Sequence, residues 1–176
     1  MALRGLLAAI EQEYGTEGLA RVRAALPADV RLRLEAPVEP DAQFPIAVPA
    51  ALHDAIRSEL GKGDLAANRR IGELAARADF GGVFRAFIRV ADYGTLLRAT
   101  ERAWQRYNSH GRVEWPFIGK GQATATIKHV KGYTEPMWEG IAGRLEAVLT
   151  LGGAKVAKVT VDEWTEHDVR YRLRWT

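Results

Sequence analysis

The segment Val169-Arg-Tyr-Arg-Leu-Arg-Trp175 decides the fold class, because apolar and basic residues alternate along it without a break. Neighbouring side chains of a β-strand point to opposite faces of a sheet, so this pattern places the apolar side chains on one face and the arginines on the other. A stretch that contains Val156, Val159 and Val161 precedes it, with a turn at residues 165–167 between the two. We predict two neighbouring strands with one buried and one solvent-facing side.

A second strand pair and a helix precede these strands. Residues 113–117 alternate between apolar residues and others, and residues 123–130 resume a strand pattern after the turn Gly119-Lys-Gly121. This predicts a hairpin, with an edge strand or a bulge at Pro116. From residue 134 the apolar period becomes that of a helix, which ends at residue 151 before two glycines. The predicted order is strand, strand, helix, strand, strand.

Helices dominate the first half of the chain. Apolar residues recur at helical spacing in residues 3–10, 17–26, 52–60, 64–78 and 95–109. Residues 30–35 alternate instead, which predicts a short strand. Four prolines between positions 37 and 49 exclude a long regular element there.

We therefore expect one α+β domain over residues 1–176. A helical hairpin and a short strand occupy residues 1–34, a proline-rich connection occupies residues 35–49, and the core occupies residues 50–176. The N-terminal and central helices are expected to pack on one side of a four-stranded antiparallel sheet with a C-terminal ββαββ arrangement. A domain of 176 residues buries enough surface to fold without disulfides or metals.

Composition narrows the classes of function. The chain contains no cysteine, which excludes disulfide frameworks, thiol catalysis and cysteine-ligated metals. No apolar stretch is long enough for a membrane span, and the first ten residues are too short for a secretory signal, so we expect a cytoplasmic protein. The formal net charge is only +3, with basic and acidic residues interspersed, so we expect no nucleic-acid partner.

The sequence also lacks motifs for catalysis and metal binding. Neither of the two serines stands in a Gly-x-Ser-x-Gly motif, and no two of the four histidines are four residues apart. We therefore expect no enzyme, no metal site and no bound cofactor. For His53 two interpretations are open, an axial haem ligand or an exposed or partly packed histidine, and we favour the second. The histidines are His53, His110, His129 and His167.

The arginines of the last strand stand about 6.6 Å apart on one face. One interpretation is a surface for a polyanion or an acidic partner. The other is a solvated face on which Asp162 and Glu163 of the neighbouring strand pair with the arginines. We favour the second, because aromatic residues that would stack on nucleic-acid bases point to the opposite face. These arginines are Arg170, Arg172 and Arg174.

The candidate ligand-binding residues are aromatic: Phe84, Phe87, Trp104 and Tyr107. In the ligand-binding interpretation, helix 95–109 forms a pocket wall together with Phe84 and Phe87. Trp104 and Tyr107 then face a void that accepts a small apolar ligand. In the alternative interpretation the same rings are part of the core and enclose no void.

Several segments carry a resemblance to a known family: Ile71-Gly-Glu-Leu-Ala-Ala, Phe84-Arg-Ala-Phe-Ile-Arg, Leu96-Leu-Arg and Trp104-Gln-Arg-Tyr-Asn-Ser-His-Gly. In this order, followed by a helix and two strands, they resemble an uncharacterised myxobacterial family of similar length. That family in turn is similar to the vinyl-reductase-type ligand-binding domain, the haem nitric-oxide-binding domain and the trafficking-complex subunits of the same fold. The resemblance implies a helical layer on a four-stranded antiparallel sheet, frequent dimers and, in several relatives, an apolar pocket.

Two departures limit what the resemblance implies. The cysteine cluster of vinyl-reductase-type domains and the Tyr-x-Ser-x-Arg propionate clamp of haem domains are both absent from this sequence, so neither a metal nor haem is carried over. We therefore predict a non-enzymatic sensory or regulatory domain that binds a small apolar ligand or a partner protein. The alternative is a pure interaction scaffold, as a homodimer or with another protein, that has no small-molecule ligand.

Overall fold

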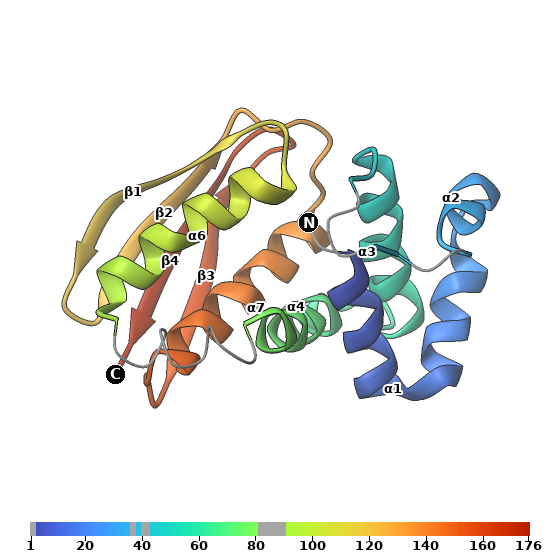
Figure 1. Cartoon of the computed structure of the whole chain (residues 1–176), viewed down its shortest axis with the longest axis horizontal. Coiled ribbons are helices and arrows are strands. Elements are labelled where there is room, and N and C mark those ends of the chain that lie inside the picture. Colours follow the sequence, from blue (N-terminus) through green and yellow to red (C-terminus); the bar gives the residue numbers. More distant parts are fainter. Residues whose placement is uncertain (1–2, 36–37, 40–42, 81–90) are drawn as a thin grey trace.

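The computed structural model describes residues 3–35, 38–39, 43–80 and 91–176, without the side chain of Tyr107. The first four helices fill one half of the molecule, and the other half contains the sheet with helix Tyr93–Tyr107 packed on it; helix Glu135–Leu151 lies where the halves meet (Figure 1). No helix in these ranges is long and apolar enough to cross a bilayer. In chain order the elements are α1 (Leu3–Ala25), α2 (Ala28–Arg33), α3 (Ala47–Glu59), α4 (Ala66–Asp79), α6 (Tyr93–Tyr107), β1 (Arg112–Gly119), β2 (Gln122–Lys128), α7 (Glu135–Leu151), β3 (Ala157–Trp164) and β4 (Val169–Trp175).

The sheet has the strand order β1-β2-β4-β3, and every neighbouring pair is antiparallel. Side chains alternate along β4 as predicted, with the apolar set buried and the arginines exposed. Helices α6 and α7 add Leu97, Trp104 and Trp138 to the core on the buried face of the sheet. The α+β class, with helices packed on a four-stranded antiparallel sheet, is therefore confirmed.

The outer face of β4 carries ion pairs to β3. Arg170 lies 3.5 Å from Glu163, and Arg172 lies 2.9 Å from Asp162, measured between nitrogen and carboxylate oxygen. Both arginine side chains are more than half exposed. The interpretation of this row as a solvated face with cross-strand pairs is therefore confirmed for these two arginines.

A second apolar core lies among the first four helices. Ile10 of α1, Leu52 and Ile56 of α3, and Ile71 of α4 are fully buried in it. Helix α7 packs against α3 and α4 on the side of this core and against β3 and β4 on the side of the sheet. One helix therefore joins the two halves of the fold.

The short strand predicted for residues 30–35 is wrong, because residues 28–33 form helix α2. Pro27 stands at the N-cap, where its missing N–H costs nothing and its fixed φ suits a helix start. Val30 and Leu34 are both buried in the helical core. These two residues lie four positions apart, so a helix brings both to the core. The alternation of apolar and basic residues in this segment arises because the arginines lie on the exposed side of the helix.

Two local irregularities change the expected faces of elements. Between Glu114 and Phe117 the β1–β2 register shifts, as expected for a bulge at Pro116 in an edge strand. Because of this shift, Phe117 is 49% exposed instead of continuing the buried face of Val113.

In α1 the backbone bends at Gly15, which has φ 70° and ψ −179°, so the two predicted helices form one bent element.

Candidate functional site

Of the four predicted ligand-binding residues, the structure describes one side chain fully. Phe84 and Phe87 lie outside the described residues, and Tyr107 ends α6 without a described side chain. Trp104 is buried, and its ring centroid lies 5.7 Å from that of Tyr133. Its indole N–H donates to the carbonyl oxygen of His110 at 3.2 Å. The pocket formed by all four residues therefore stays a prediction.

The polar groups beside Trp104 are already occupied. The Tyr133 hydroxyl donates to Asn108 Oδ1 at 2.7 Å, and Asn108 Nδ2 donates to the Trp104 carbonyl at 3.0 Å. On its other side Tyr133 stacks on Trp138, with centroids 4.5 Å apart. Burial raises the pKa of Tyr133, so the phenol stays a protonated donor. These contacts tie α6 to the loop before α7.

A surface groove of about 630 Å³ lies at the opposite end of α6. We call it the α6 groove. Its walls come from the start of α6, the turn between β1 and β2, and the end of β4. The lining residues are Asp92, Tyr93, Gly94, Arg98, Ile118, Gly119, Lys120, Gly121, Trp175 and Thr176. A smaller hollow of about 170 Å³ lies beside α2, and Trp104 lines neither of the two.

Local sequence signals build the groove. Asp92 is the N-cap of α6, because its carboxylate accepts from the Thr95 backbone N–H at 3.0 Å and from the Thr95 hydroxyl at 2.6 Å. Gly121 has a φ of 74°, which glycine adopts without strain, and its carbonyl accepts the Trp175 N–H at 2.9 Å. The Tyr93 and Trp175 rings meet with centroids 5.1 Å apart at 49°. These contacts hold the start of α6, the β1–β2 turn and the end of β4 together.

Two cations and one anion line the α6 groove. Arg98 comes from α6 and Lys120 from the β1–β2 turn. A Cβ at Gly94 would lie 3.0 Å from both Arg98 Nη2 and Asp92 Oδ1, so the guanidinium rests over the first helical turn near the carboxylate. Hydrogen bonds from Thr95 lower the pKa of Asp92, which therefore stays ionised. Basic side chains therefore outnumber acidic ones on the lining, two to one.

The sequence predicted an exposed or partly packed His53, and this prediction is wrong. The side chain is completely buried. Its Nδ1 lies 3.1 Å from Asn68 Nδ2, which also donates to the His53 carbonyl at 2.8 Å. The imidazole also hydrogen-bonds to the backbone of Pro136. Burial, together with the charge of Arg144, lowers the pKa of His53 to about 3, so the ring is neutral.

Glycines bring α4 and α7 into backbone contact beside His53. A Cβ at Gly72 of α4 would lie 2.0 Å from the Gly140 carbonyl oxygen, and one at Gly143 would lie 2.0 Å from the Arg69 carbonyl oxygen. A Cβ at Gly140 would lie 2.5 Å from Cε1 of His53. No side chain therefore separates the two helices at these positions.

Arg69 fastens this contact at one edge. Its Nη2 lies 2.6 Å from Glu139 Oε2, and its Nη1 lies 2.7 Å both from Glu146 Oε1 and from the Val159 carbonyl oxygen. Glu146 in turn accepts the Val159 N–H at 2.9 Å. The half-buried guanidinium thus links α4, α7 and β3 through charge-assisted hydrogen bonds.

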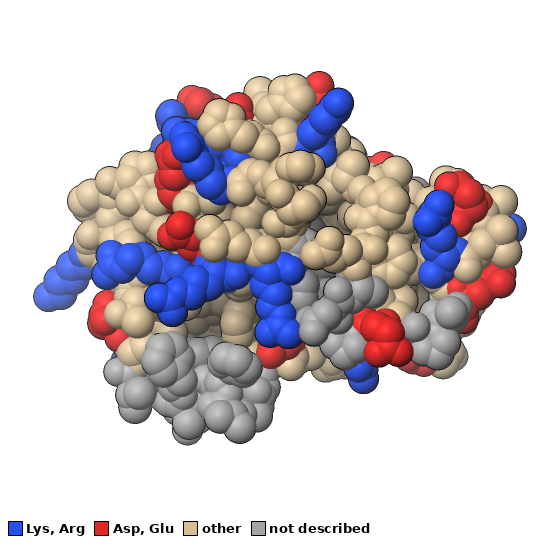
Figure 2. Space-filling model, turned by 45° about the horizontal axis from the view of Figure 1, so that its top comes forward, with Lys and Arg blue, Asp and Glu red and all other residues tan. Residues whose placement is uncertain are grey.

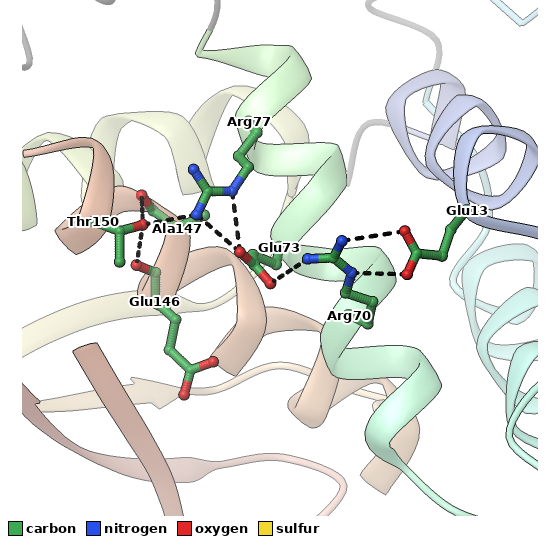
Figure 3. A network of polar contacts seen from close by, with 7 residues as sticks. All are labelled: Glu13, Arg70, Glu73, Arg77, Glu146, Ala147 and Thr150. Atoms are coloured by element: carbon green, nitrogen blue, oxygen red, sulfur yellow. Dashed lines mark hydrogen bonds and ion pairs between the residues drawn. The ribbon is translucent and has the colours of Figure 1, made fainter. Parts of the chain in front are cut away.

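An exposed network crosses the same helices (Figure 3). Arg70 bridges Glu13 of α1 and Glu73 of α4, with nitrogen–oxygen distances of 3.0 Å in both pairs. Arg77 then joins Glu73 at 2.9 Å and donates to the Thr150 hydroxyl of α7 at 3.2 Å. Exposed pairs of this kind contribute little free energy, so their effect is mainly to fix the register of the helices.

Comparison with known proteins identifies a family and a fold. A family profile described as "Protein of unknown function (DUF2378)" matches residues 1–176. No match was found among curated proteins. An Fe(II) unliganded H-NOX protein from K. algicida has a TM-score of 0.71 at 9% identity, covering 98% of this chain and 93% of that chain. An oxygen-binding H-NOX domain related to soluble guanylate cyclases has a TM-score of 0.69 at 12% identity, covering 99% of this chain and 93% of that one.

A third similar structure, described by its haem redox potential and porphyrin distortion, has a TM-score of 0.69 at 13% identity and covers 99% of both chains. At such identities the likeness shows the fold alone. The predicted similarity to the haem nitric-oxide-binding domain is confirmed at that level. The similarities to vinyl-reductase-type domains and trafficking-complex subunits stay predictions.

The surroundings of His53 do not fit a haem. An axial ligand needs a free imidazole nitrogen and the macrocycle needs a slot. The ring of His53 is hydrogen-bonded on Nδ1 and packed on Gly140, and the helices on either side of it are in backbone contact. Within the described ranges, no three His, Asp or Glu side chains gather as a metal site either.

Sequence reasoning missed the α6 groove. The Gly119-Lys-Gly121 segment was interpreted only as a hairpin turn, and Tyr93 and Trp175 are far apart in the sequence. The signal that points to the groove is the pair of glycines that flank a lysine opposite a capped helix start. Because the family profile matches the whole of residues 1–176, the chain belongs to the DUF2378 family of proteins of unknown function.

Proposed function

We propose that this protein is a non-enzymatic regulatory domain that binds a small molecule in the α6 groove. The observation that carries the proposal is the groove itself. Its volume of about 630 Å³ falls within the roughly 300–1,000 Å³ of small-molecule sites, and it combines an aromatic floor with two cations. A ligand there contacts α6, the β1–β2 turn and the end of β4 at once, and so changes how firmly these elements hold together.

The chemistry of the lining supports binding rather than catalysis. The lining contains no serine, cysteine or histidine. Its carboxylate, Asp92, is engaged by two hydrogen bonds from Thr95. An activated nucleophile needs a base beside it, and in the described part of the chain no hydrogen bond joins the side chains of Tyr93, Lys120 or Thr176 to a carboxylate or a histidine.

The fold supports a sensory role only by analogy. The similar solved structures are named as H-NOX proteins, one of them in an oxygen complex. In this chain the joint beside His53 is closed by glycine contacts, so ligand recognition moves to the surface. We propose a sensor of the same fold that works without haem.

A thermal-shift screen combined with amide NMR tests the proposal. Metabolite-sized compounds are added to the full chain, and hits are located from the amide signals of Gly94, Gly119 and Gly121. We expect hits that raise the melting temperature and shift these signals, since a ligand at 100 times its Kd adds about 2.7 kcal/mol to the free energy of unfolding. Hits that instead shift the indole N–H signal of Trp104 would move the site to the predicted aromatic pocket and contradict the groove.

Docking of a partner protein on α6 is a second candidate. Arg98, Arg102 and Arg106 are exposed and stand four residues apart, so they follow one side of the helix. Figure 2 shows Lys and Arg side chains in a row across this face of the molecule. Such a row complements an acidic helix. A dimer in light scattering that Arg102→Glu converts to a monomer would support the scaffold, and a monomer at all concentrations would exclude its homodimeric form.

A further inference from the structure

We infer that the α6 groove selects an organic anion with a flat apolar body, whose charged group lies between Arg98 and Lys120. The inference rests on the proposed function, because it names the ligand class of the same groove. It is carried by two features of the lining: cations from two different elements that have no ion-pair partner in the described part of the chain, and two aromatic rings in contact.

In the described part of the chain, the two cations of the groove, Arg98 and Lys120, have no carboxylate within ion-pair distance, although the charge of Arg98 contributes to the lowered pKa of Asp92. Most arginines of α4 and β4, by contrast, already have a carboxylate partner. A pair of uncompensated cations that converge on one hollow attracts an anion, because the charge-assisted hydrogen bonds of the ligand replace those to water.

The anion of the groove does not cancel this attraction. Asp92 is satisfied by Thr95, and it lies near the guanidinium only at the first turn of α6. Lys120 stands on the opposite wall, in the β1–β2 turn. A ligand anion between Arg98 and Lys120 therefore meets two positive groups, with the Asp92 carboxylate beside the first of them.

The floor of the groove suits a flat ring. Tyr93 is half-buried and packs at 5.1 Å on Trp175, so the two rings form one apolar surface. The β1–β2 turn lies next to them, and the Phe117 ring packs against Gly119 in this turn. Aromatic faces bind flat apolar molecules by offset or tilted stacking. A ligand with a ring and one anionic group matches both the floor and the walls.

Fluorescence titration of the full chain with 8-anilino-1-naphthalenesulfonate tests this class. N-phenyl-1-naphthylamine, which lacks the sulfonate, is the neutral probe of the same shape. The test variant is Arg98→Gln with Lys120→Gln. The matched control is Arg174→Gln with Lys158→Gln, which removes the same two charge types from neighbouring positions on the outer face of the sheet.

We expect the sulfonate probe to bind one site and to lose about tenfold or more in affinity in the Arg98/Lys120 variant. The control variant should leave that affinity within twofold, and the neutral probe should be insensitive to both variants. The ligand-class inference is overturned if the sulfonate probe binds no better than the neutral one, or if both variants weaken it equally. The proposed function fails separately if neither probe shifts the amide signals of Gly94, Gly119 and Gly121.

Discussion

The two sides of α7 are built in opposite ways. Toward the sheet, the helix presents large side chains, among them the fully buried Met137, Trp138 and Leu149. Toward α4, it presents Gly140 and Gly143, which lie directly against the α4 backbone. The side toward the sheet is stabilised by large buried side chains, and the side toward α4 is stabilised by close backbone contact at glycines. The stability of the joint between the two halves of the fold therefore has two independent sources, which substitutions can separate.

Trp138→Ala breaks the sheet side and should have the largest effect. The ring is completely buried, stacks on Tyr133 and donates its N–H to the Thr165 carbonyl at 3.1 Å. We expect a loss of about 3–5 kcal/mol in the free energy of unfolding, measured by urea denaturation. Trp164, which is 45% exposed, provides the control, and Trp164→Ala should cost much less. Equal losses in the two variants would show that the sheet side is not the packed one.

Gly72→Ala breaks the α4 side by adding a single methyl group. Because the new carbon would lie 2.0 Å from the Gly140 carbonyl oxygen, the helices must move apart, and we expect a loss of about 2–3 kcal/mol. Gly5→Ala is the matched control in α1, since its methyl group meets the side chain of Asp79, which is paired with Arg144, and no backbone. The control should cost clearly less than Gly72→Ala in urea denaturation. A neutral Gly72→Ala would contradict the backbone contact.

The two sides of α7 also differ in how far the sequence predicts them. Alternation along β4 and the apolar period of α7 predicted the sheet core, because buried volume leaves a periodic pattern. Gly72 and Gly140 leave no such pattern, since a glycine in a helix is equally compatible with solvent and with a neighbouring backbone. The prediction of a strand at residues 30–35 was wrong for a related reason. The segment is so short that its alternating arginines fit the period of a helix as well as the period of a strand.

Titration of His53 sharpens the description of the α4 side. Its pKa of about 3 in the folded protein lies below the ordinary value of about 6.5, so the unfolded chain binds a proton more readily. The stabilisation is therefore complete above pH 6.5 and is lost progressively as the pH falls toward 3. At pH 5 we expect a loss of about 2 kcal/mol relative to pH 7 from this residue.

Melting curves of the wild type and of His53→Gln between pH 5 and pH 7 measure this contribution. The variant should be less dependent on pH than the wild type over this range. His129→Gln, at an exposed position, is the control and should leave the pH dependence unchanged. A pH dependence that is identical in the wild type and His53→Gln would show that His53 is accessible to protons.

The outer face of the sheet, which α7 does not touch, should contribute least. Arg172 is 56% exposed and pairs with Asp162 at 2.9 Å. We expect Arg172→Ala to cost less than about 1 kcal/mol. Trp175→Ala, three residues further along β4 and on the buried face, should cost about 3–5 kcal/mol. The reverse order in thermal melts would mean that the register of β4 is wrong.

The candidate site was less predictable than the fold. Trp104 lies in the predicted helix, but its indole N–H donates to the His110 carbonyl, and Asn108 binds both the Trp104 carbonyl and the Tyr133 hydroxyl. The α6 groove depends on three segments that only the tertiary structure brings together. Arg98 and Lys120 are ordinary exposed residues in the sequence, and they become a candidate site only because the Tyr93–Trp175 contact places their elements side by side.

The central claim is that the described part of this H-NOX-like fold has a closed joint at α4 and α7, where His53 is not placed to bind haem. Titration of the purified chain with haemin, followed by absorption spectroscopy, tests it most directly. We predict no stoichiometric haem complex, and spectra of the wild type and His53→Ala that coincide. A one-to-one complex with a Soret band that disappears in His53→Ala would contradict the claim.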